Sequence, residues 1–88
     1  MPKLSIFFGI EISIRTRETP HHRPHFHARY AGEEVSIAID TLEVLAGLIQ
    51  QRALGMVMEW ALLHRDELLT AWNEIQTGRV PAKIAPLR

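Results

Sequence analysis

Apolar and polar residues alternate from residue 8 to residue 15, with isoleucine at positions 10, 12 and 14. A period of two is typical of a β-strand with one buried face, so we expect a strand here. Residues 4–8 either extend this strand or form a separate short strand across Gly9. The following segment holds Pro20 and Pro24, and because proline lacks the backbone N–H, residues 17–24 are predicted to form a loop.

A β-hairpin is predicted from residues 25–30 and 33–39, with Ala31 and Gly32 as a two-residue turn. This turn sets the register, in which Phe26 faces Ile37 and His27 faces Ser36. One face then carries the apolar residues Phe26, Ala28, Tyr30, Val35, Ile37 and Ile39. The other face carries the polar residues His25, His27, Arg29, Glu34 and Ser36. We expect the polar face to be exposed to solvent, with Arg29 paired to Glu34.

Apolar residues recur every three or four positions from residue 51 to about residue 77, which predicts one long helix that ends at Gly78. A helix of that length spans roughly 40 Å, more than a small sheet covers. We therefore expect Leu62 and Leu69 to contact a second copy of the chain or another protein. The alternative is a kink near Gly55 or His64 that lets both halves pack on the sheet.

The expected fold is a small α+β domain, an antiparallel meander of three or four strands packed against one long C-terminal helix. One domain over residues 1–88 follows from the chain length, with strands within 4–48, the helix at about 51–77 and an extended tail at 78–88. Cysteine is absent, which excludes disulfides and thiolate sites. The apolar N-terminal run is too short for a signal peptide or a membrane span, so we expect a cytoplasmic protein.

Charge is unevenly distributed along the chain, although the formal net charge is zero. Residues 15–29 hold four arginines and four histidines, whereas residues 30–51 hold four acidic residues and no lysine or arginine. The balanced total argues against a general nucleic-acid coating protein. The basic segment still offers Arg15, Arg17 and Arg23 as contacts for RNA or phosphate, or as ordinary solvated charges.

Several motifs together resemble a bacterial family known as domain of unknown function 4160. They are Pro-His-Phe-His-Ala-x-Tyr at 24–30, Gly-Glu at 32–33, Ile-x-Ile-Asp at 37–40, Glu-Val-Leu-x-Gly at 43–47 and Glu-Trp-Ala-x-x-His at 59–64. The resemblance implies that the chain is the toxin component of a two-gene toxin–antitoxin module. Its implied partner is an antitoxin-like protein of the domain of unknown function 2442 family. No catalytic mechanism comes with the resemblance.

Three uses fit His25 and His27, whose side chains share one strand face. As acid and base on RNA, one takes the 2′-hydroxyl proton and the other protonates the 5′-oxygen, with Arg29 stabilising the charge and His64 as a third member. As metal ligands, they are completed by His21, His22 or His64. As structural residues, they are solvated strand residues or hydrogen-bond anchors for the loop. We expect a metal-independent ribonuclease that needs no cofactor; the alternatives are a non-enzymatic protein-binding or regulatory module and a histidine-based metal-binding domain.

Overall fold

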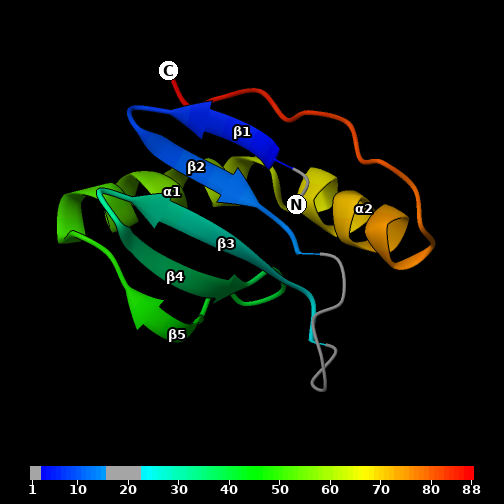
Figure 1. The fold of residues 1–88 in the computed structure, drawn as a ribbon, viewed down its shortest axis with the longest axis horizontal. Helices are drawn as coiled ribbons and strands as arrows, with labels where there is room; N and C mark the ends of the chain where they lie inside the picture. The colour runs from blue at the N-terminus through cyan, green and yellow to red at the C-terminus, as the bar shows by residue number, and fades with distance from the viewer. Residues whose placement is uncertain (1–2, 16–22) are drawn as a thin grey trace.

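The computed structural model describes residues 3–15 and 23–88, which form a five-stranded antiparallel sheet and two helices (Figure 1). The strands lie side by side in chain order: β1 (Lys3–Phe7), β2 (Ile10–Ser13), β3 (His25–Tyr30), β4 (Glu33–Ala38) and β5 (Val44–Leu48). The helices are α1 (Gln51–Leu63) and α2 (Arg65–Gln76). The α+β class is therefore confirmed. The predicted numbers of three or four strands and one long helix were wrong.

The extra strand arises because the chain turns at Phe8 and Gly9, whose φ angles are 50° and 79°. Two successive residues with positive φ make a tight hairpin turn that matches the twist of paired strands. Glycine adopts this conformation without steric cost. Residues 3–7 therefore fold back as β1 on β2, in place of continuing the same strand.

The β3–β4 hairpin has the predicted register. Phe26 pairs with Ile37, His27 with Ser36 and Arg29 with Glu34 across the two strands. Phe26 and Ala28 are fully buried on the face covered by the helices. A one-residue slip would have moved this whole apolar set to the other face, so burial of the core holds the register.

The helical segment breaks at His64, which separates α1 from α2. The N–H of His64 bonds to the carbonyl of Ala61, three residues back, and ends α1. Asp66 and Glu67 then occupy the first turn of α2, where negative side chains are favourable. Among the described residues, no helix is long and apolar enough to cross a membrane.

The core lies between the sheet and the helices, centred on Trp60, whose ring contacts Phe7 and Phe26. The C-terminal segment, residues 78–88, runs back from α2 along β1 (Figure 1). There the N–H of Ile84 donates to the carbonyl of Leu4 at 2.8 Å, and the indole N–H of Trp60 donates to the carbonyl of Ala85 at 2.8 Å. This segment therefore covers the outer edge of β1.

Candidate functional site

His25 and His27 project from the side of β3 opposite Phe26 and Ala28, as the alternation of β3 dictates. The ring centroids of His25 and His27 are 5.2 Å apart in an edge-to-face arrangement. Both residues are buried, with exposed fractions of 9% and 5%. The expectation of solvent-exposed imidazoles was wrong, because side chains far apart in sequence pack against them.

His27 belongs to a polar network that joins three strands. Its Nδ1 lies 3.2 Å from the hydroxyl of Ser36 and 3.3 Å from the carboxylate of Glu34. Glu34 also forms an ion pair with Arg15, at the end of β2. The expected pair between Arg29 and Glu34 is therefore replaced by a pair with Arg15. Arg29 is exposed and makes no hydrogen bond or ion pair with the other described residues.

His25 is held at the start of β3 by its backbone surroundings and by α2. Its Nδ1 lies 2.8 Å from the carbonyl oxygen of Arg23. Since a carbonyl only accepts, the proton sits on Nδ1. The ring also packs on Trp72 of α2, with centroids 5.2 Å apart. The imidazole thus ties the sheet to the second helix.

His64 lies apart from this pair, at the break between the helices. Its ring packs on Trp60 and its Nδ1 bonds to the Glu67 carboxylate at 2.5 Å. Trp60 contacts the core face of β3, so His64 is on the opposite side of the strand from His27. In the described part of the chain, no three histidine or carboxylate side chains are placed to hold a metal ion. The metal alternative also used His21, which lies outside the described residues together with Arg17 and His22.

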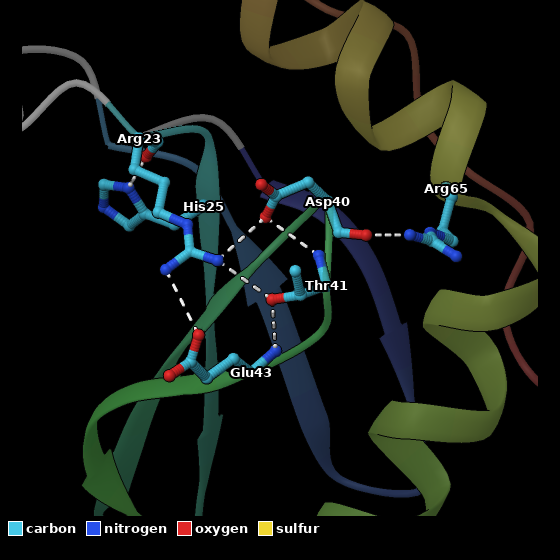
Figure 2. Close-up of polar contacts among 6 residues, drawn as sticks. All are labelled: Arg23, His25, Asp40, Thr41, Glu43 and Arg65. Atoms are coloured by element: carbon cyan, nitrogen blue, oxygen red, sulfur yellow. Dashed lines mark hydrogen bonds and ion pairs between the residues drawn. The ribbon is translucent and has the colours of Figure 1, made fainter.

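Arg23 forms a second polar cluster beside His25, shown in Figure 2. Its guanidinium reaches the carboxylates of Asp40 at 3.3 Å and Glu43 at 3.2 Å, and it donates to the Thr41 hydroxyl at 3.0 Å. From the other side, Arg65 of α2 donates to the backbone carbonyl of Asp40. Arg23, expected to meet phosphate, is thus surrounded by acidic partners that fasten the 39–43 turn to the sheet and to α2.

The same cluster sets the ionisation of Asp40. Desolvation works against its charged form, but the N–H of Thr41 and the guanidinium of Arg23 outweigh that effect and hold the pKa of Asp40 below its ordinary value. Asp40 therefore stays ionised and keeps its contact with Arg23 in mildly acidic solution.

The comparison with protein families matches Domain of unknown function (DUF4160) over residues 9–73, more than half of the chain. The chain belongs to this family. No curated protein and no solved structure matches it significantly. The matched range includes both polar clusters, α1 and most of α2, so these are features of the DUF4160 part of the chain.

Two hollows lie beside the N-terminal turn of α2 in this DUF4160 protein. One, of about 390 Å³, is lined by Pro24, Ile39, Asp40, Arg65, Asp66 and Leu69. The other, of about 360 Å³, is lined by Leu62, Leu63, His64, Arg65, Asp66 and Glu67. Neither hollow includes His25 or His27 in its wall. The prediction of one continuous helix left no junction for these hollows. A kink near His64 was the alternative, and the acidic residues after His64 were the available signal for a new helix.

Proposed function

We propose that this DUF4160 protein acts by binding a second protein, as one half of a two-gene toxin–antitoxin module. The observation that carries the proposal is the apolar surface at the junction of α1 and α2. Leu62, Leu63 and Leu69 are 62%, 69% and 42% exposed there. A group of large apolar side chains left in solvent marks a protein-binding surface more often than a chance arrangement.

The arrangement of the helix junction suits the binding of a partner protein. We define the helix junction by Leu62, Leu63, Arg65, Asp66 and Leu69. Arg65 and Asp66 line both hollows, so the two hollows adjoin with leucines along their walls. Apolar anchors surrounded by charged residues are typical of protein interfaces. A partner side chain inserted into either hollow contacts leucine and meets a charged group at the rim.

Burial of the histidine pair supports binding over catalysis. A general acid or base has to reach its substrate within hydrogen-bond distance. Here the Nδ1 of His25 is engaged by the carbonyl of Arg23, and the Nδ1 of His27 faces Ser36 and Glu34. These contacts support a structural role for both imidazoles in the sheet.

The test is complex formation with the protein encoded beside this gene, for which the family resemblance proposes a 2442-family partner. Leu62→Lys and Leu69→Lys are expected to weaken the complex at least about tenfold, because each places a charge in the apolar contact. Val80→Lys is the control, since Val80 is an exposed apolar residue in the C-terminal segment. Light scattering and calorimetry measure the complex, and circular dichroism checks the fold. A monomer that binds no neighbour-encoded protein contradicts the proposal.

A second candidate function is metal-independent RNA cleavage by the histidine pair, supported by the 5.2 Å separation of the rings and the Arg15–Glu34 pair beside them. One imidazole then accepts the 2′-hydroxyl proton while the other protonates the leaving 5′-oxygen. His25→Asn and His27→Asn are expected to lower cleavage by about a hundredfold or more. Leu62→Lys keeps cleavage but loses neutralisation by the partner. Full cleavage by both histidine variants excludes this function.

A further inference from the structure

Strand β5 is an edge of the sheet that no other described segment covers. All five of its residues are exposed, and three are large and apolar: Val44, Leu45 and Leu48. Sheet edges are usually protected by charged side chains, by proline or by a covering segment, because an open edge pairs with other chains. Strand β5 contains neither charge nor proline. In the described part of the chain it pairs with β4 alone.

The opposite edge of the same sheet, strand β1, is covered by another segment of the chain. There the C-terminal segment lies along β1 and bonds to it through Ile84 and Leu4. Figure 1 shows β5 as the outermost strand on the other side, with no described element beyond it. The fold thus covers one edge with its own chain and leaves the other edge available.

The backbone of β5 is held close to β4, which keeps its outer edge in place. Gly47 has a φ of +74°, and a Cβ at this position would lie 2.3 Å from the carbonyl oxygen of Glu34. Only glycine permits so close an approach. The register also shifts between Ser36 and Ile37, which leaves one extra residue in β5 and bends the strand.

We propose that β5 binds an extended strand from a partner protein, which adds to the sheet edge and carries lysine or arginine at the end of its apolar stretch that lies beside Glu33. Main-chain hydrogen bonds supply affinity in this mode of recognition, and side chains supply specificity. The proposal concerns a different element from the helix junction and stands without it.

Charge selects the basic partner. Because β4 and β5 are antiparallel, Glu43 lies at one end of β5 while Glu33 and Glu34 lie near its other end. Arg23 serves both Asp40 and Glu43. Glu33 makes no ion pair with the other described residues. Glu34 is paired with Arg15, and Arg65 lies against Asp40. Glu33 is therefore the carboxylate near β5 whose charge no described partner offsets.

The same charges disfavour a second copy of this chain as the occupant. Two copies of β5 paired antiparallel about Ala46 place Val44 of one opposite Leu48 of the other. Glu43, which shares Arg23 with Asp40, then approaches the end of the partner copy where Glu33 lies. Like charges brought together in this way destabilise a strand pair.

The probes are two synthetic peptides with the same alternating threonine–valine core, one flanked by lysines and the other by glutamates. We expect the lysine peptide to bind about tenfold more tightly at low salt, with a difference that shrinks as salt screens the charges. Amide shifts in the NMR spectrum are expected in β5 and not in α1 or α2. Glu33→Lys reduces the preference for the lysine peptide. Glu59→Lys, the same charge change on the exposed part of α1, leaves it unchanged.

The proposal is overturned if the two peptides bind equally, if neither peptide binds, or if the amide shifts are confined to the helices. Self-association of the free chain that shifts the β5 amides also overturns it, because the occupant is then a second copy. Each variant is checked by circular dichroism, so that loss of fold is not taken for loss of binding.

Discussion

Removing the imidazole of His27 tests whether the polar face of the sheet is a packed layer or a solvated surface. In the structure His27 is 5% exposed and lies within 3.3 Å of both Ser36 and Glu34. His27→Ala leaves the partly buried Ser36 hydroxyl without this partner, and the lost hydrogen bond costs about 0.5–1.5 kcal/mol. Glu34 loses less, because it is partly exposed and keeps Arg15.

The emptied space adds a second cost. At roughly 24 cal/mol per Å³, a residual cavity of roughly 40 Å³ costs about 1 kcal/mol. The expected total is about 1.5–2.5 kcal/mol, against a stability of about 4–13 kcal/mol for a domain of this size. Because 1 kcal/mol shifts the melting temperature of a small domain by roughly 4–8 °C, His27→Ala is expected to melt about 10 °C below the parent.

Arg29→Ala is the matched control, since Arg29 lies two residues along the same strand, on the same face, and is exposed. Its cost is expected to stay within about 0.5 kcal/mol. Thermal and denaturant unfolding measure both variants. If His27→Ala is no less stable than Arg29→Ala, the packed-layer reasoning is refuted, and the imidazole belongs to an accessible surface.

Three further predictions concern other parts of the fold. Gly47→Ala is expected to cost about 1–3 kcal/mol and to speed amide exchange in β5, because the new Cβ meets the Glu34 carbonyl; unchanged exchange contradicts this. Since the pKa of Asp40 is held below its ordinary 3.8, its contribution to stability is present above that pH and lost as pH falls through the lowered pKa. Asp40→Asn should therefore flatten the acid limb of a stability–pH profile, and a parallel profile argues against the cause given. Ile84→Ala is expected to cost about 2–4 kcal/mol in denaturant unfolding, because the residue is buried; a neutral effect means that the C-terminal segment does not contribute to the core.

The candidate site shows which contacts the local sequence pattern predicts and which it does not. Alternation correctly placed His25 and His27 together, because strand side chains point to alternate faces. It did not reveal that Trp72 packs on one ring or that Glu34 prefers Arg15 to Arg29. Those contacts depend on how distant elements meet. The helix break at His64 was foreseen only as the alternative to one long helix, since the apolar stripe continues through His64 with Trp60 before it and Leu68 after it.

The sequence by itself determined the α+β class, the β3–β4 register and the apolar face of that hairpin, because turn geometry and apolar periodicity act over a few neighbouring residues. Only the tertiary structure decided which surfaces remain open. The C-terminal segment covers β1 through Ile84, while β5 and the leucines of the helix junction stay exposed. Whether a residue is exposed depends on which side chains pack against it in space. Those side chains often come from elements far apart in the chain, so no local sequence pattern encodes their contacts.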